Sequence, residues 1–186
     1  MRLGRLGYYA DFVVYPLTVM GLAAAGLATT PLLRWPNWLA AFVGGFAIWT
    51  LAEYLLHRYV LHHIPWIKDM HDAHHADQMA LVGTPTWLSF VIVVAFVFAP
   101  LYAWAGGLVA TGMTAGVTLG YLCYVGVHHM VHHMPSKPGS YLTAMKRRHM
   151  LHHHFDEERN FGVSSGFWDR IFHTDVTSAE AAAARR

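Results

Sequence analysis

The chain has 186 residues, of which 55% are hydrophobic and only 13% are charged. A soluble domain of this length usually carries about 25% charged residues, so the composition argues against a water-soluble globular protein. The net charge of +2 gives no reason to expect a nucleic acid partner, and the single cysteine, Cys123, excludes a disulfide framework.

Uncharged apolar segments predict membrane helices. No charged residue occurs in residues 12–30, 37–52 or 84–127. About 20 apolar residues cross a bilayer as a helix, so the last segment is long enough for two crossings. The predicted fold is therefore an all-α integral membrane domain spanning residues 1–186, with four transmembrane helices near residues 12–30, 36–57, 86–104 and 108–128.

The connections between these helices follow from glycine and charge. Gly106 and Gly107 predict the turn between the last two helices, since paired glycines interrupt helices. We interpret the first apolar segment as an anchor rather than a cleaved signal peptide, because it is long and no small-residue cleavage site is followed by a soluble domain. A soluble bundle of buried helices is disfavoured, because such helices need charged outer faces to meet water.

The basic residues predict the orientation. With four crossings, the N-terminus, the segment after Arg58 and the tail after His132 share one side. Of the 13 Lys and Arg residues, all except Arg34 fall on that side. The positive-inside rule then makes it cytoplasmic. We therefore expect both termini in the cytoplasm, together with a helical cap formed by residues 58–84 and 133–175.

Ten of the 15 histidines fall into four clusters with metal-ligand spacing. The clusters are His57 and His62; His71, His74 and His75; His128 and His132; and His149, His152 and His153. Residues three and four apart share a helix face, so each HxxHH triplet is expected to bring three imidazoles to one spot. A structural zinc site needs about four ligands, so ten histidines indicate two ions.

The topology places all four clusters on the cytoplasmic side, where one cap could gather them. Carboxylates near them are few, so the site is expected to be nearly all nitrogen, which suits zinc, copper, iron or nickel. Glu53 is either an acceptor for the second nitrogen of a ligand imidazole or a boundary charge that reaches water. Surface histidine tracts or a tag remnant are the alternative explanation, and the ordered repetition of HxxHH argues against them.

Four segments carry a resemblance to a known family. They are EYLLHRYVLHH (53–63), MHDAHH (70–75), GYLCYVGVHHMVHH (120–133), and KRRHMLHHHF (146–155) followed by FGVSSGFWDRIFHT (161–174). Their order and gaps resemble the fatty acid hydroxylase superfamily, which includes fatty acid and sphingolipid hydroxylases and sterol desaturases. The aromatic residues Phe161, Trp168 and Phe172 are most similar to the fatty acid 2-hydroxylase branch.

The resemblance implies an O2-dependent membrane monooxygenase that hydroxylates a long acyl chain, with carbon 2 as the position in that branch. It implies two iron ions, which zinc can replace in a purified sample because divalent affinity favours zinc over Fe(II). The implied metal ligands are His57, His62, His71, His74, His75, His128, His132, His149, His152 and His153. His129 and His133 form a competing i, i+4 pair, and His154 competes with its neighbours.

This chain departs from the branch at Val125 and His129, where relatives usually have Asp and Tyr, so the support of the metal ligands is expected to differ. No fused cytochrome-like segment is recognisable in the sequence. A separate redox protein is therefore expected to supply electrons, as in a bacterial inner-membrane relative. The sequence indicates no oligomeric state.

A carotenoid or sterol substrate is the main alternative within the same chemistry, and residues 161–174 favour the acyl branch. A non-enzymatic haem carrier or metal transporter is the alternative of another class. Haem carriers place paired histidines within membrane helices, and transporters need ionisable residues at mid-membrane. Both patterns are missing from this sequence.

Overall fold

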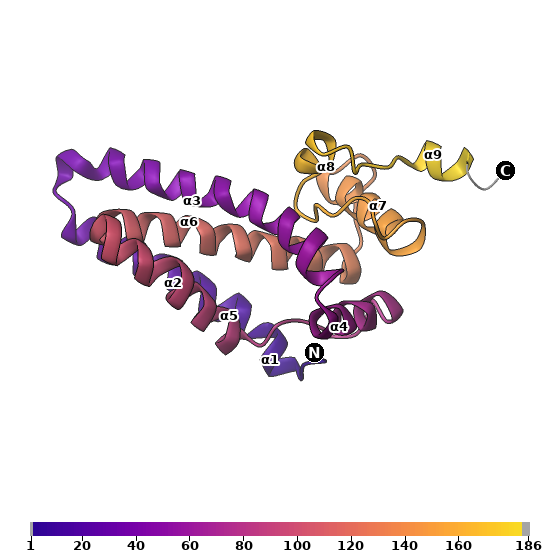
Figure 1. Cartoon of the computed structure of the whole chain (residues 1–186), viewed down its shortest axis with the longest axis horizontal. Helices are drawn as coiled ribbons and strands as arrows, with labels where there is room; N and C mark the ends of the chain where they lie inside the picture. The colour runs from indigo at the N-terminus through magenta and orange to yellow at the C-terminus, as the bar shows by residue number, and fades with distance from the viewer. Residues whose placement is uncertain (1, 184–186) are drawn as a thin grey trace. The chain divides into compact units, whose positions relative to one another are not determined.

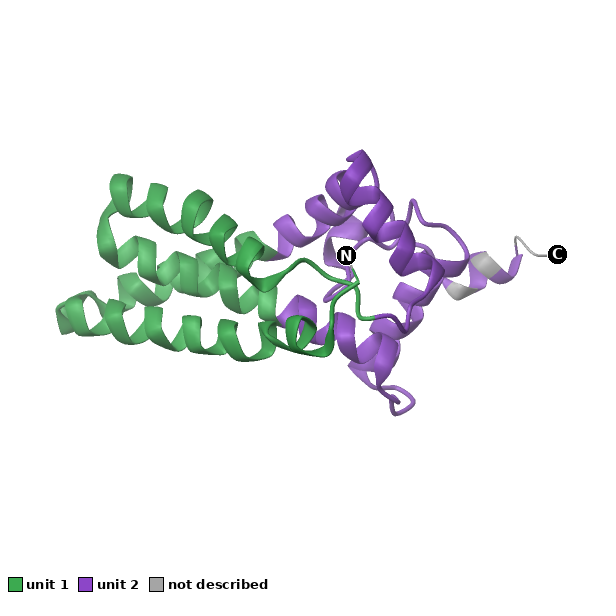
Figure 2. Cartoon of the chain, turned by 90° about the horizontal axis from the view of Figure 1, so that it is seen from below, with its two compact units in different colours: residues 1–49, 81–122 green, residues 50–80, 123–186 purple. Residues whose placement is uncertain are grey.

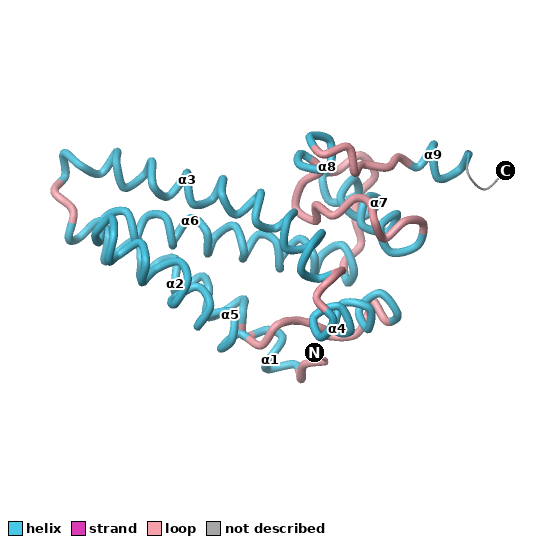
Figure 3. Tube along the Cα trace, viewed as in Figure 1, coloured by secondary structure: helices cyan, strands magenta, loops and turns pink. Residues whose placement is uncertain are grey.

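The computed structural model describes residues 2–183, with the side chains of all of these except Ser178 and Ala181. Within the described residues the chain is helical, and no strand is formed (Figure 3). The one extended pairing among them is an isolated antiparallel bridge between Arg2 and Val82. The predicted all-α class is confirmed.

Figure 1 shows the helices in chain order. They are α1 (Arg5–Tyr9), α2 (Asp11–Thr29), the 3-10 turn η1 (Leu32–Arg34), α3 (Trp35–Leu55), the π-helix η2 (Leu56–Leu61), α4 (Pro65–Ala76), α5 (Thr86–Val93), the π-helix η3 (Val94–Phe98), α6 (Ala99–His133), α7 (Tyr141–His154), α8 (Phe167–Ile171) and α9 (Ser178–Ala183).

The chain divides into two compact units (Figure 2). Unit 1 contains residues 1–49 and 81–122, and unit 2 contains residues 50–80 and 123–186. The helices α3 and α6 each contribute to both units. All ten histidines predicted as ligands belong to unit 2.

Three helical stretches of the described chain are long and apolar enough to cross a membrane, as expected for an integral membrane protein. They are Arg5–Thr29, Leu32–Leu61 and Thr86–His133. The third stretch contains both of the last two predicted spans. Its backbone leaves the helical conformation at Gly106, with φ of 80° and ψ of 173°. The predicted break at the glycine pair is confirmed, while four separate crossings remain a prediction.

Unit 1 shows that the chain folds back at this break. The buried carboxylate of Asp11 in α2 accepts hydrogen bonds from Thr86 Oγ1 in α5 and from Tyr121 OH in α6. Tyr15 OH donates to Ser89 Oγ in α5, and the Tyr15 ring meets that of Tyr121 edge-on at 4.8 Å. The beginning of α5 and the later turns of α6 therefore lie beside the same part of α2.

Small residues let α3 and α6 approach closely in unit 1. Gly112, Gly116 and Gly120 recur at every fourth position of α6, and a Cβ atom on any of them would lie closer than 3.0 Å to an atom of α3. Gly45 of α3 meets the backbone of Met113 in the same way. Small-xxx-small spacing of this kind is typical of helices that pack within a membrane, where backbone contact replaces the hydrophobic driving force.

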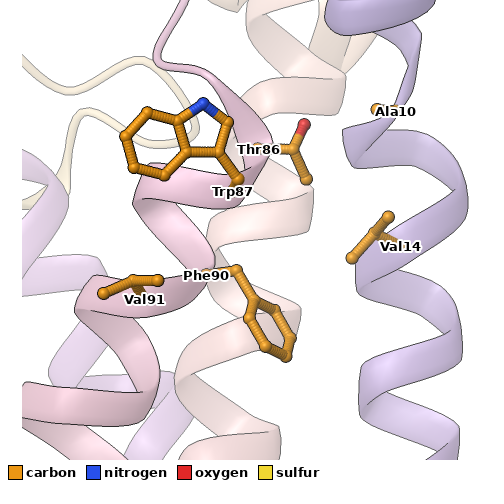
Figure 4. Close-up of a pocket in the computed structure, with 6 residues that line it drawn as sticks. All are labelled: Ala10, Val14, Thr86, Trp87, Phe90 and Val91. Atoms are coloured by element: carbon orange, nitrogen blue, oxygen red, sulfur yellow. The ribbon is translucent and has the colours of Figure 1, made fainter.

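Unit 1 also contains an apolar groove of about 380 Å³ (Figure 4). Its walls are formed by residues of α2 with its preceding turn and of α5, namely Ala10, Val14, Thr86, Trp87, Phe90 and Val91. The groove contains no histidine, so it is separate from the predicted metal site.

The core of unit 2 forms where the end of α6 packs on α7. Val127 and Val131 of α6 cluster with Met145 of α7 and with Val163 of the segment that follows it. Ser140 caps the start of α7, because its Oγ accepts the backbone N–H of Thr143 at 3.2 Å. This packing fixes the helices that carry half of the predicted ligands.

Candidate metal centre

The π-helix η2 brings His57 and His62 together. In an α-helix, residues five apart point about 140° away from each other. The wider i→i+5 turns of a π-helix return such residues to the same side. The two rings stack with centroids 5.2 Å apart, and His62 is the residue that ends η2. The close approach of these two rings, five residues apart in the sequence, therefore depends on the π-helical turn.

The structure divides each HxxHH triplet between two places. On α4, the Nε2 atoms of His71 and His75 lie 3.0 Å apart, whereas His74 Nε2 lies 3.1 Å from His132 Nε2 of α6. On α7, His149 and His153 pair at 3.0 Å, whereas His152 Nε2 lies 3.3 Å from His62 Nε2. The expectation of three imidazoles at one spot is therefore corrected: two of each triplet share a place and the third joins the other.

Two groups of histidines with converging nitrogen atoms result. Within each group the ligand atoms all lie within 4.8 Å of one another. One consists of His57, His62, His71 and His152, and the other of His74, His132, His149 and His153.

The two remaining predicted ligands adjoin these groups. His75 Nε2 lies 3.0 Å from His71 Nε2, and His128 Nε2 lies 3.0 Å from His74 Nε2. We call the resulting sets of five the first group (His57, His62, His71, His75, His152) and the second group (His74, His128, His132, His149, His153). The rings of His75 and His153 stack at 4.1 Å, so the two groups adjoin.

Burial keeps these imidazoles in the form that binds metal. Desolvation lowers the pKa of His62 to about 4, that of His74 to about 4 and that of His152 to about 3. Burial followed by neighbouring imidazoles also lowers the pKa of His71, His149 and His153. A neutral imidazole offers a nitrogen lone pair, so these rings are ready to bind a cation at neutral pH.

Two outer nitrogens of the first group, those of His57 and His152, reach backbone carbonyls of one segment. His57 Nδ1 donates to the carbonyl oxygen of Phe161, and His152 Nδ1 donates to that of Arg159 at 2.8 Å. With Nδ1 protonated by these bonds, the lone pair of each ring lies on Nε2, which faces the group. We call residues 159–164 the carbonyl loop.

Buried polar side chains hold the carbonyl loop in place. Asn160 has a φ of 55°, and its side chain donates to the Val176 carbonyl at 3.1 Å and accepts from the Val176 N–H at 3.0 Å. Asp169 accepts from the N–H groups of Phe161 at 2.8 Å and Gly162 at 3.0 Å. Both side chains are fully buried, with 0% exposure.

Glu53 holds the far end of the same loop. Its Oε1 accepts the N–H groups of Val163 at 2.9 Å and Ser164 at 2.7 Å, and its Oε2 accepts the Ser164 hydroxyl. Only 4% of Glu53 is exposed. Both predicted roles of Glu53 are therefore corrected. Its carboxylate does not reach water, and its hydrogen bonds go to Val163 and Ser164 rather than to an imidazole. It supports the loop that bonds His57.

The outer nitrogens of the second group differ. The Nδ1 atoms of His74, His132, His149 and His153 are all buried, and none has a hydrogen-bond partner among the described residues. The rings of this group are instead held by their packing against one another: His149, for example, lies 4.8 Å from His132 and 4.5 Å from His153 between ring centroids.

The remaining histidines have other contacts. His63 Nδ1 donates to the Arg58 carbonyl, and Gln78 Nε2 donates to His154 Nε2. His129 and His133 stack on each other with centroids 4.7 Å apart, and His173 is exposed. None of these joins the two groups of converging nitrogens.

The residues present fit transition metals. Each group offers several neutral imidazole nitrogens within reach of a single ion, and no carboxylate belongs to either set. All-imidazole donor sets suit iron, zinc, copper and nickel rather than magnesium or calcium. Each group could therefore hold one such ion. The resemblance included residues 161–174, but the sequence carried no signal for the role of the carbonyl loop, because its acceptors are main-chain oxygens.

Comparison with known proteins identifies the family of this chain. The profile of the fatty acid hydroxylase family matches residues 42–174. The fatty acid 2-hydroxylase of Rattus norvegicus is 37% identical over 151 residues, which cover 73% of this chain and 39% of that protein. The ceramide very long chain fatty acid hydroxylase SCS7 of Saccharomyces cerevisiae is 36% identical over 153 residues, covering 72% of this chain and 37% of that protein.

A solved structure shares the fold. The structure described as full-length Scs7p, with only its hydroxylase domain visible, matches with a TM-score of 0.77 and 27% identity, covering 92% of this chain and 67% of that one. The chain spans about two-fifths of the length of the rat and yeast relatives. The family match includes every histidine of both groups, and the chain belongs to the fatty acid hydroxylase family.

Proposed function

We propose that this chain is a membrane lipid hydroxylase that uses O2 to hydroxylate a long acyl chain, at carbon 2 of that chain. The observation that carries the proposal is the convergence of histidine Nε2 atoms in two adjoining groups, within the segment that matches the family. Relatives named fatty acid 2-hydroxylase and ceramide very long chain fatty acid hydroxylase support an acyl substrate and its position.

The ten histidines of the two groups would hold two metal ions, iron in the cell. When bound, such ions supply the redox chemistry that activates O2 and oxidises a C–H bond. The chain's own residues hold the ligand rings: the carbonyls of Phe161 and Arg159 keep the proton of His57 and His152 on Nδ1, so that Nε2 is free to bind. A separate redox protein supplies the electrons.

In this proposal the chain is one membrane domain with four crossings. The support is the break at Gly106 within Thr86–His133, together with the charge asymmetry that four crossings would give, with all Lys and Arg residues except Arg34 on one side. The termini and the metal site then face the cytoplasm, in a bacterial inner membrane.

Reporter fusions test this orientation. Alkaline phosphatase, which is active only outside the cytoplasm, is expected to be active when fused after Gly107 and inactive when fused after Gly83. Activity at both points, or at neither, would refute the four-span arrangement without bearing on the chemistry.

Lipid analysis tests the function. The chain is expressed with iron and a reducing partner in a bacterial host that makes both acyl lipids and carotenoids, under ¹⁸O2. Extracted acyl chains are expected to gain one labelled hydroxyl at carbon 2, and His74→Ala is expected to abolish the product. Labelled carotenoid with unmodified acyl chains would reject the substrate, and unlabelled lipids throughout would reject the hydroxylase.

A further inference from the structure

We propose that the two metal positions are unequal: the first group retains its ion, and the second group exchanges its ion readily. The inference rests on the proposed binding of one ion by each group. It concerns the relative affinity of the two groups for their metal ions, which the family assignment does not specify.

The difference lies in the outer nitrogens. In the first group, His57 and His152 donate from Nδ1 to carbonyl oxygens of the carbonyl loop. In the second group, the Nδ1 atoms of His74, His132, His149 and His153 are buried and have no partner within the described chain. A partner on the outer nitrogen fixes the ring's orientation and raises its basicity, and its loss typically lowers metal affinity by about 10–100-fold.

The carbonyls that orient the first group are themselves fixed. Asp169 accepts the N–H of Phe161, the residue whose carbonyl bonds His57, and it pairs with Arg148 at 3.0 Å. Asn160 lies between Arg159 and Phe161, the two residues whose carbonyls accept these bonds, and two hydrogen bonds join its side chain to Val176. The loop therefore presents its carbonyls in one arrangement before an ion binds, so little ordering remains to be done on binding.

Asn160 and Asp169 are positioning residues in this arrangement. Neither belongs to the groups of converging nitrogens, and each acts through the loop on His57 and His152. Disturbing them should weaken the first group and leave the second unchanged. A general loss of structure would weaken both groups together.

Metal release from the intact protein tests the inequality. The purified chain in detergent is loaded with Zn²⁺, its zinc content is measured, and a chromogenic chelator in excess captures the released ion. The expected result is two zinc ions per chain, released in two phases of equal amplitude with rates at least about 10-fold apart. A single phase carrying both ions overturns the inequality.

Stoichiometry separates this failure from failure of the proposed function. Fewer than two zinc ions per chain at saturation would overturn the two-metal proposal on which the inference rests. That outcome appears in the zinc content before any chelator is added, whereas a difference in affinity between the two groups appears only in the release rates.

Two histidines of α7 assign the phases. His149 and His152 lie on the same helix and are 1% and 0% exposed, but they belong to the second and the first group. His149→Ala is expected to remove the fast phase, and His152→Ala the slow phase. The opposite assignment overturns the proposal.

Loop variants test the cause. Asn160→Gly keeps the positive φ and removes both side-chain bonds to Val176, and it is expected to speed the slow phase at least about 10-fold with the fast phase unchanged. Asp169→Asn is expected to act in the same direction. Glu158→Gln, the same change from carboxylate to amide at an exposed side chain outside the carbonyl loop, is the matched control and should alter neither rate. Equal acceleration of both phases by Asn160→Gly, or no change in the slow phase, overturns the role of the loop.

Discussion

His149 and His152 lie within one turn of α7, yet they face different histidine groups. His149 Nε2 lies 2.9 Å from His132 Nε2, and His152 Nε2 lies 3.3 Å from His62 Nε2. The HxxHH triplet thus works as a bridge, because its i, i+4 pair serves one group and its remaining histidine serves the other. Since α4 divides its triplet in the opposite sense, two helices fix the spacing between the groups.

The choice between two histidine pairs on α6 can be tested directly. His128 and His132 meet His74 through their Nε2 atoms at 3.0 Å and 3.1 Å, whereas His129 and His133 stack on each other. The double variant His128→Ala/His132→Ala is expected to lose the second ion, about one metal per chain, and all hydroxylation. Metal analysis and product formation measure both effects.

The shifted pair is the matched control. His129→Ala/His133→Ala changes the same residue types at the same spacing one position along α6, and it is expected to keep both ions and most activity. Loss of one ion from this variant, with retention by His128→Ala/His132→Ala, would exchange the roles of the two pairs.

Close packing of α3 on α6 predicts contrasting effects at neighbouring glycines. A Cβ atom at Gly45 would overlap the Met113 carbonyl, whereas one at Gly44 meets nothing within 4 Å. Gly45→Ala is expected to destabilise the folded protein by about 1–3 kcal/mol through overpacking. Gly44→Ala should be neutral or stabilising by up to about 1 kcal/mol, because alanine favours helix.

Thermal unfolding in detergent, followed by tryptophan fluorescence, measures both changes. Equal midpoints for Gly45→Ala and Gly44→Ala would mean that α3 does not pack against α6 at Gly45 and Met113.

Glu53 is expected to stabilise the carbonyl loop. Glu53→Ala leaves the N–H groups of Val163 and Ser164 and the Ser164 hydroxyl without their acceptor. Buried donors left unpaired cost about 1–3 kcal/mol each, so the variant should unfold at a clearly lower temperature. Ser164→Ala, which removes only one of the three bonds, should cause a smaller loss.

Glu158→Ala is the control for this set, because that glutamate is exposed and near the same loop. It is expected to unfold within about 0.5 kcal/mol of the parent. A stability loss at Glu158 as large as that at Glu53 would show that the loop does not depend on the buried carboxylate.

The sequence predicted the features that residue type and spacing determine. The apolar segments, the break at Gly106 and the histidine clusters all follow from local patterns. All eight histidines of the two converging sets are among the ten that were predicted. The resemblance selected His152 and His153 over His154, which the structure places in contact with Gln78 instead.

Other features could not be predicted, because they depend on backbone geometry. An α-helical spacing rule does not allow for the π-turns of η2, so it could not show that His57 and His62 share a face. The carbonyls of Phe161 and Arg159 have no residue signature, and any amino acid could present them. The sequence left Glu53 as either an acceptor for an imidazole or a boundary charge, because its partners Val163 and Ser164 lie 110 and 111 residues away along the chain.

Acid is expected to destabilise the metal-free protein. The folded-state pKa values of His62, His74 and His152 are lowered to about 4, about 4 and about 3 by burial, whereas the unfolded chain titrates near the ordinary value of 6.5. Well above pH 6.5 these rings are neutral in both states and the folded state keeps its full stability. As the pH falls from 6.5 towards 4, the unfolded state binds more protons, so the free energy of unfolding decreases.

Unfolding midpoints of chelator-treated protein between about pH 8 and pH 4.5 measure this effect, since the proton uptake that drives it falls within that range. The midpoint should be level above about pH 7 and fall steadily below it. His62→Gln removes one of the titrating rings, so its midpoint should fall less steeply over the same interval. A midpoint that stays level to pH 4.5, or rises, would mean that these imidazoles are solvated in the metal-free fold, because desolvation is the largest cause of the difference between their folded and unfolded pKa values.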